Sequence, residues 1–230
     1  MIEIELAGPG KNALGSELMS SIKAQIDAAG GEPLLLRGAG DAFSAGLNLK
    51  EIAGLDPAGM QAFLRLLVDM SVALFEYPGP TVAWVNGHAI AGGCVLALCC
   101  DWRVGSANPR ARIGLNEVAL GLRFPPRLLR ILQNQVRGLE RVVLHAGLYA
   151  PERALAWGLL DEVSEDGEAL ARQRLKELGA HPAKGYADAK ADLRGGVSEV
   201  DPADEAAFLA EVLPAWTSDE LRSRIQAFLK

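Results

Sequence analysis

The sequence of 230 residues is poor in cysteine, in aromatic residues and in basic runs. Its three cysteines, Cys94, Cys99 and Cys100, are too few and too clustered for a disulfide framework, so we expect small buried thiols in a reducing compartment. No CxxC or Cys/His ligand spacing indicates zinc, and no metal site is expected. Lys and Arg number 23 against 29 Asp and Glu, for a formal net charge of −6. A main role in nucleic-acid binding is therefore disfavoured, because such proteins usually present a basic face.

Neither a leader nor a membrane span is expected. Residues 1–5 (MIEIE) contain no charged segment followed by an apolar one, which indicates no signal peptide and predicts a cytoplasmic protein. Residues 77–100 lack Asp, Glu, Lys and Arg over about the length of a bilayer span. However, Pro78, Pro80, Asn86 and four glycines interrupt this stretch. We predict a buried strand and helix here, with no contact to a membrane.

Three familiar motifs of enzyme chemistry are incomplete. Residues 40–46 (GDAFSAG) approach a nucleophile elbow, but the G-x-S-x-G frame needs glycine where Ala42 stands. No GxxxxGK[ST] loop is present, which disfavours phosphoryl transfer from a nucleotide. Residues 87–93 (GHAIAGG) follow an apolar run but lack the G-x-G-x-x-G spacing of a dinucleotide loop. Each of these three chemistries is therefore disfavoured.

Apolar residues make up 50% of the chain, and their spacing predicts its elements. Residues 34–37 and 81–85 are short apolar runs typical of buried strands, and residues 91–100 are predicted to form a buried helix. Shorter strands are expected at 102–104 and 112–114. Another helix is predicted from one face repeating every three or four positions, at Met60, Phe63, Leu64, Leu67, Ser71, Leu74 and Phe75. This alternation predicts an α/β fold with parallel strands covered on both faces.

Two strand-to-glycine junctions lie about 45 residues apart in the sequence. Residues 34–37 lead into 43–49 (FSAGLNL), and residues 81–85 lead into 90–94 (IAGGC), where a helix opens. Parallel strands could bring the junctions together and aim two backbone N–H groups at one carbonyl oxygen, which would be an oxyanion hole. Alternatively, the glycines only permit close packing of helix on strand. The local sequence leaves both interpretations open.

A family resemblance favours the first interpretation. Residues 43–52 (FSAGLNLKEI) and 85–94 (VNGHAIAGGC), continuing to Cys100-Asp101, resemble the two signature blocks of the crotonase (enoyl-CoA hydratase/isomerase) superfamily. Further segments that resemble the family are residues 12–14, 154–163 and 216–229. The resemblance implies a spiral of ββα turns at 1–165, which holds an acyl-CoA site. It also implies a C-terminal helical region at 166–230, for oligomerisation and for closing the site.

The resemblance also implies the ligand and the assembly. The substrate would be an acyl-CoA thioester, with no cofactor beyond the coenzyme A that the substrate carries. The protein would form a homotrimer or a dimer of trimers. The apolar stretch 207–213 (AFLAEVL) in the predicted C-terminal helices is a candidate for the subunit contacts.

Particular residues acquire roles from the same resemblance. The amides of Leu47 and Gly92 would form the oxyanion hole, and the Ala45 carbonyl would meet the adenine end of coenzyme A. Asn48 replaces the aspartate usual after the oxyanion residue, and its side chain can still cap the following helix. The set of residues expected to bind substrate comprises Ala45, Gly46, Asn48, Leu49 and Asn116.

The acid–base positions separate the chemistries of the family. Hydration needs a water held between two carboxylates, but the first of these positions is Val95. The second is Glu117, within residues 113–121 (IGLNEVALG), which resemble the Δ3,Δ2-enoyl-CoA isomerase branch. The predicted reaction shifts a 3-enoyl-CoA to the conjugated trans-2-enoyl-CoA, with Glu117 as the single base. Another crotonase-fold reaction (hydratase, thioesterase or decarboxylase) is the alternative, ahead of an RNA-binding or catalytically silent relative. Phe124, Pro125 and Pro126 are candidate walls of the acyl pocket.

Overall fold

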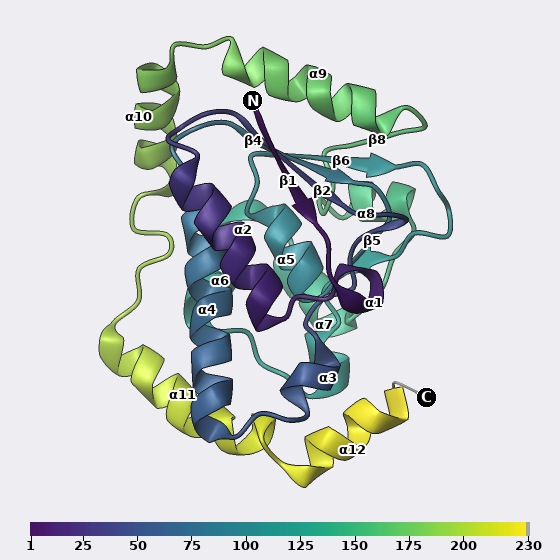
Figure 1. Ribbon diagram of the computed structural model, residues 1–230, viewed down its shortest axis with the longest axis vertical. Coiled ribbons are helices and arrows are strands. Elements are labelled where there is room, and N and C mark those ends of the chain that lie inside the picture. The colour runs from purple at the N-terminus through teal and green to yellow at the C-terminus, as the bar shows by residue number, and fades with distance from the viewer. Residues whose placement is uncertain (229–230) are drawn as a thin grey trace.

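The computed structural model describes residues 1–228, in which eight strands form two parallel sheets (Figure 1). The strands are β1 (Ile2–Leu6), β2 (Leu34–Gly38), β3 (Ala42–Ser44), β4 (Thr81–Val85), β5 (His88–Ile90), β6 (Trp102–Ser106), β7 (Ile113–Gly114) and β8 (Glu162–Ser164). The helices of the first two thirds are α1 (Pro9–Asn12), α2 (Ser16–Ala28), α3 (Leu49–Ile52), α4 (Pro57–Phe75), α5 (Gly92–Leu98), the 3₁₀ helix η1 (Glu117–Leu120), α6 (Pro126–Gln135), α7 (Leu139–His145) and α8 (Pro151–Ala156). Four more helices follow, α9 (Gly167–Gly179), α10 (Ala183–Arg194), α11 (Pro202–Trp216) and α12 (Asp219–Phe228).

The two sheets alternate along the chain. The larger sheet has the order β1-β2-β4-β6-β8 and the smaller one the order β3-β5-β7, with parallel pairing throughout. The strand pairs β2–β3, β4–β5 and β6–β7 each give one strand to the larger sheet and the next to the smaller, and helices follow each pair. Strands β1 and β8 form the two edges of the larger sheet. This is the predicted ββα spiral, and it places the loops that follow β3, β5 and β7 beside one another.

The apolar runs form the elements that their patterns predict. Strand β2 is buried at Leu34, Leu35 and Leu36, and every residue of α5 is buried. The stretch 77–100 is therefore the buried strand and helix that we expected. The three cysteines are unpaired and buried, also as expected. Strand β8 was not predicted, because its residues are only half-buried and carry no apolar run.

Helix α4 has the length and apolar composition of a membrane span. It begins where the Asp56 side chain accepts a hydrogen bond from Gly59 N at 2.7 Å, and it packs on α2, α6 and α11. Its apolar residues, Met60, Phe63 and Leu64 among them, belong to the main core of the protein. The contacts with these three helices account for the hydropathy of α4.

The helices after β8 pack directly on this core. Helix α9 covers the outer face of the larger sheet, where Ala171 and Leu175 meet Val82 and Val104 (Figure 1). Helix α10 is fastened by the buried carboxylate of Asp101, which pairs with Lys190 Nζ at 2.8 Å and Arg194 at 2.9 Å and accepts a hydrogen bond from Tyr186. The division into regions at residue 165 stays a prediction.

The apolar stretch 207–213 lies differently from our expectation. Phe208 and Val212 are buried in the protein's own core, where α11 packs on α4 and α6. Helix α11 therefore uses its apolar face within the chain, which argues against that face as a subunit contact. Large exposed apolar side chains lie at Met1, at Val118 of η1, at Leu144, Leu148 and Leu155 in and near α7 and α8, and at Leu193 of α10.

Candidate active site

The segment after β3 leaves one backbone amide free. Ala45 N donates to Lys11 O at 3.0 Å, Gly46 N to Ser44 Oγ at 3.2 Å, and Asn48 N to Leu14 O at 2.9 Å. Among the described residues, no backbone carbonyl accepts the N–H of Leu47. Segment 11–14 thus fixes the amides of Ala45 and Asn48, and Ser44 Oγ fixes that of Gly46. The Leu47 N–H remains available to a ligand.

Asn12 holds this segment in place, a role that our sequence analysis missed. Its backbone is left-handed, with φ of 60°, and its side chain is 4% exposed. The Asn12 Nδ2 donates to Ala39 O at 2.9 Å and to Ala42 O at 2.8 Å, while Asn12 O accepts from Ser44 Oγ at 2.8 Å. Asparagine tolerates the left-handed region better than most residues. The family resemblance at residues 12–14 included Asn12 but did not indicate that its side chain holds the segment after β3.

The second junction supplies the other free amide. Ala91 has φ of 48°, an uncommon conformation for a residue with a side chain, and its N–H donates to Gly114 O at 2.9 Å. Helix α5 begins at Gly92, and its own bonding starts with Val95 N to Ala91 O at 2.9 Å. The Gly92 N–H therefore has no partner within the helix.

The two junctions touch. A Cβ added at Gly92 would lie 3.0 Å from Leu47 Cδ2, and one added at Gly46 would lie 2.7 Å from Ile90 O. Glycine is therefore required at Gly46, which also has φ of +90°. The expectation that the sheet brings the junctions together is confirmed by the parallel pairing of β3 with β5.

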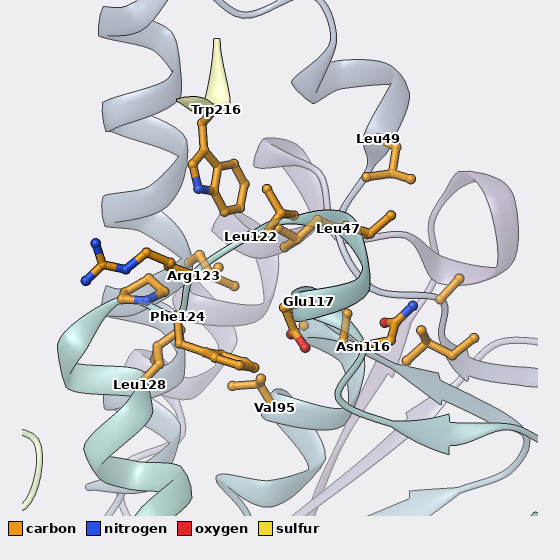
Figure 2. Close-up of a pocket in the computed structure, with 17 residues that line it drawn as sticks. Leu47, Leu49, Val95, Asn116, Glu117, Leu122, Arg123, Phe124, Leu128 and Trp216 are labelled. Carbon is orange, nitrogen blue, oxygen red and sulfur yellow. The ribbon is translucent and has the colours of Figure 1, made fainter. Parts of the chain in front are cut away.

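A cavity, partly open to solvent, lies against both junctions (Figure 2). Six of the predicted site residues line it: Ala45, Leu47, Leu49, Gly92, Asn116 and Glu117. Two do not. Gly46 faces Ile90, and Asn48 caps α3, accepting a hydrogen bond from Glu51 N at 3.4 Å as its sequence position suggested. Phe124 and Pro125 line the cavity as proposed, whereas Pro126 lies in a neighbouring groove.

Glu117 is buried in the wall of the same cavity. It opens η1, which Gly121 closes in a left-handed conformation, and its side chain is 9% exposed. Burial raises the pKa of Glu117 to about 8. Its Oε2 has no hydrogen-bond partner among the described residues. Val95 of α5 lines the same cavity and offers only methyl groups.

Asn116 precedes Glu117 on this wall. Its side chain is 8% exposed, and its Oδ1 also lacks a hydrogen-bond partner in the described part of the chain. The η1 wall thus holds two buried, unpaired oxygens from adjacent residues that line the cavity.

The far end of the cavity is apolar and comes from distant parts of the chain. Leu67 of α4, Leu128 of α6 and Trp216 of α11 line it. Helix α12 then packs over η1, where Arg224 Nη1 donates to Leu120 O at 3.4 Å. Sequence analysis did not assign these residues to the site, because only tertiary packing brings the three helices together.

Comparison with known proteins agrees with this arrangement. The family model for enoyl-CoA hydratase/isomerase matches residues 1–229. The chain belongs to this family, as its two signature blocks indicated.

Among characterised relatives, the human mitochondrial enoyl-CoA delta isomerase 1 is 30% identical over 192 residues, which are 82% of this chain and 64% of the relative. The mouse protein of the same name is 37% identical over 134 residues, which are 57% of this chain and 46% of the relative. The chain thus spans about half to two thirds of the length of these mitochondrial relatives. A mevalonyl-coenzyme A hydratase from Beauveria bassiana is 33% identical over 183 residues, which are 73% of this chain and 64% of that protein.

Solved structures share the fold. The human mitochondrial delta3-delta2-enoyl-CoA isomerase superposes with a TM-score of 0.91 at 27% identity, covering 99% of this chain and 92% of that chain. An enoyl-CoA hydratase from Bacillus halodurans has a TM-score of 0.84 at 24% identity, covering 98% of this chain and 95% of its own.

Proposed function

We propose that the protein isomerises 3-enoyl-CoA thioesters to the conjugated trans-2-enoyl-CoA. The observation that carries this proposal is the number of carboxylates that line the cavity. Among the described residues that line it, Glu117 is the only carboxylate, and Val95 stands where hydration would need a second one. A single base is sufficient for isomerisation, because the reaction adds no water.

The proposed reaction proceeds through a thioester enolate. The thioester oxygen accepts hydrogen bonds from the N–H groups of Leu47 and Gly92, and Glu117 removes a proton from C2. The electron pair of that C–H bond moves toward the carbonyl. Glu117 then returns the proton at C4, the C3–C4 double bond shifts to C2–C3, and no atom is gained or lost. Preorganised donors of this kind are worth roughly 10²–10³ in rate each.

The environment of Glu117 suits this role. An α-proton of a thioester is very weakly acidic, so the base must have a raised proton affinity and the enolate must be stabilised as it forms. The pKa of Glu117, raised by burial to about 8, meets the first requirement. The apolar walls at Leu128 and Trp216 would hold the acyl chain and keep bulk water away.

We further propose the ligand and setting that family membership suggests. Coenzyme A enters as part of the substrate, with no separate cofactor, and the protein acts in the cytoplasm as a homotrimer or a dimer of trimers. The exposed leucines of α7, α8 and the loop between them are the candidate subunit contacts. A monomer in sedimentation equilibrium at micromolar concentration would contradict the assembly.

Hydration is the second candidate, favoured by the similarity to hydratases such as the one from Beauveria bassiana. Proton NMR separates the two reactions with purified protein. Incubation with trans-3-hexenoyl-CoA should yield the conjugated 2-enoyl product, and crotonyl-CoA should gain almost no C3 hydroxyl. Hydration of crotonyl-CoA at a rate rivalling the isomerisation would overturn the proposal and assign a second acid to the site.

A further inference from the structure

The side-chain amide of Asn116 is buried on the cavity wall, and its Oδ1 has no partner in the part of the chain that the structure describes. Native proteins leave few buried polar atoms unpaired, and each such atom calls for an explanation. The backbone of Asn116 is well anchored, because its carbonyl accepts from Ala119 N at 3.1 Å. The side chain is therefore held at the cavity with an acceptor that the protein itself does not use.

The position of Asn116 along the cavity indicates which part of a ligand it would meet. In the view of Figure 2, the Glu117 carboxylate lies between Asn116 on one side and Phe124 and Leu128 on the other. The acyl chain would extend toward the apolar side, past Phe124 and Leu128. The thiol side of the thioester would then extend toward Asn116 and Leu49.

We propose that Asn116 Oδ1 accepts a hydrogen bond from the secondary amide N–H nearest the sulfur in the thiol arm of the substrate. This inference rests on the proposed function and adds a recognition contact to it. Only a two-carbon spacer separates the thioester sulfur from that amide nitrogen in coenzyme A. The contact fixes the thioester along the cavity, and thereby places C2 before Glu117. Asn116 is thus a specificity residue for thioesters that carry this amide.

A pair of small substrates tests the contact. The N-acetylcysteamine thioester of trans-3-hexenoic acid keeps the amide, and the S-pentyl thioester replaces it with methylenes. Asn116→Leu, which is similar in size, should lower kcat/KM for the first thioester about tenfold or more, as the loss of one buried hydrogen bond does. For the S-pentyl thioester the loss should stay below about twofold. Equal losses on both substrates would overturn the proposal.

Stability provides a second readout. Because the protein leaves Oδ1 unpaired, Asn116→Leu should unfold at the same temperature as the wild type or higher. Asn86→Leu is the matched control. Asn86 Oδ1 accepts from Gly38 N at 2.9 Å, and its Nδ2 donates to Gly40 O at 2.9 Å, so this variant should unfold at a lower temperature. A comparable destabilisation at Asn116, or failure of both Asn116→Leu and Asn116→Ala to fold, would give the amide a structural role and contradict the proposal.

Binding measurements distinguish a failure of the Asn116 contact from a failure of the proposed isomerase function. If the wild type isomerises neither thioester, the function is wrong, but saturated hexanoyl thioesters still test the contact without chemistry. By calorimetry, the wild type should bind the N-acetylcysteamine thioester about tenfold more tightly than the S-pentyl thioester. Asn116→Leu should abolish this preference. A wild type without the preference would refute the contact.

Discussion

The two walls of the cavity satisfy their polar groups in opposite ways. On the junction wall, the amides of Ala45, Gly46 and Asn48 are all bonded, and Asn12 uses its side chain fully. On the η1 wall, an oxygen of Glu117 and an oxygen of Asn116 are buried without partners among residues 1–228. One wall is fixed by internal hydrogen bonds and offers N–H donors, whereas the other offers acceptors.

In the proposed mechanism, this difference separates the groups that hold the site in place from the groups that react. A buried polar atom without a partner costs about 1–3 kcal/mol, a considerable share of the 5–15 kcal/mol by which typical domains are stable. A chain that keeps two such atoms together loses stability, and a ligand that binds them restores part of it. The donors suit a thioester oxygen that becomes negative, and the acceptors suit an acidic C–H and an amide N–H.

Removing the base should have the largest effect on activity. Glu117→Gln keeps the shape of the side chain and should lower kcat for isomerisation by about 10²–10⁴, since the proposed general base is lost. Glu140→Gln, at an exposed carboxylate on α7, is the matched control and should keep the wild-type rate. A Glu117→Gln protein that keeps more than about a tenth of the wild-type kcat would show that another group takes the proton.

Loosening the junction wall should have the next largest effect. Asn12→Ala removes the hydrogen bonds to Ala39 and Ala42 and places alanine in a left-handed conformation. We expect a loss of roughly 2–4 kcal/mol in the free energy of unfolding and roughly 10–100-fold in kcat, because the Leu47 amide shifts. Asn12→Gly tolerates the left-handed backbone and should recover part of both losses. Unchanged kcat in a destabilised Asn12→Ala protein would mean that Asn12 does not position the site.

The burial of Glu117 in the η1 wall should make the free energy of unfolding depend on pH. The pKa of Glu117 is raised in the folded state to about 8, so the folded protein retains a proton that the unfolded chain releases from about pH 4.5 upward. The contribution of Glu117 to the free energy of unfolding is therefore largest below pH 4.5. This contribution is lost as the pH rises from about 4.5 through about 8. Urea unfolding should show Glu117→Gln gaining roughly 3–5 kcal/mol over the wild type between pH 5 and pH 9. A constant difference across this range would mean that the carboxylate is solvated.

Adding a second carboxylate to the cavity should have the smallest effect on activity. Val95→Glu introduces the acid that hydration needs, and crotonyl-CoA hydration should rise above the wild-type background, measured by proton NMR. The gain should be small, because two adjacent carboxylates in an apolar cavity keep one of them protonated. A folded variant with no gain at any pH between 6 and 9 would argue that Val95 does not mark the missing hydratase acid.

The junction wall could be predicted from sequence far better than the rest of the cavity. Glycines after apolar strands are local signals that marked the two junctions, and the family resemblance then assigned the amides of Leu47 and Gly92 to them. Glu117 was found because its neighbours resemble one branch of the family. Asn12 was missed, since its hydrogen-bond partners come from the segments before it and around β3.

The apolar end of the cavity shows why its other lining residues could not be predicted from the sequence. Leu67 and Trp216 come from helices about 150 residues apart, and each belongs to an ordinary amphipathic pattern. The same ambiguity misled the expectation for residues 207–213, since an apolar helix face looks alike whether it packs within a chain or between chains. Only the packing of α11 on α4 and α6 distinguishes the two.

The pH dependence of kcat/KM for trans-3-hexenoyl-CoA tests the single buried base most directly. Burial raises the pKa of Glu117 to about 8, and the base must be ionised to accept a proton. The rate constant should rise about tenfold per pH unit below pH 8 and level off above it, with one ionisation, and this rise should be absent in Glu117→Gln. A profile that is flat between pH 6 and pH 9, or the same profile in Glu117→Gln, would contradict the account.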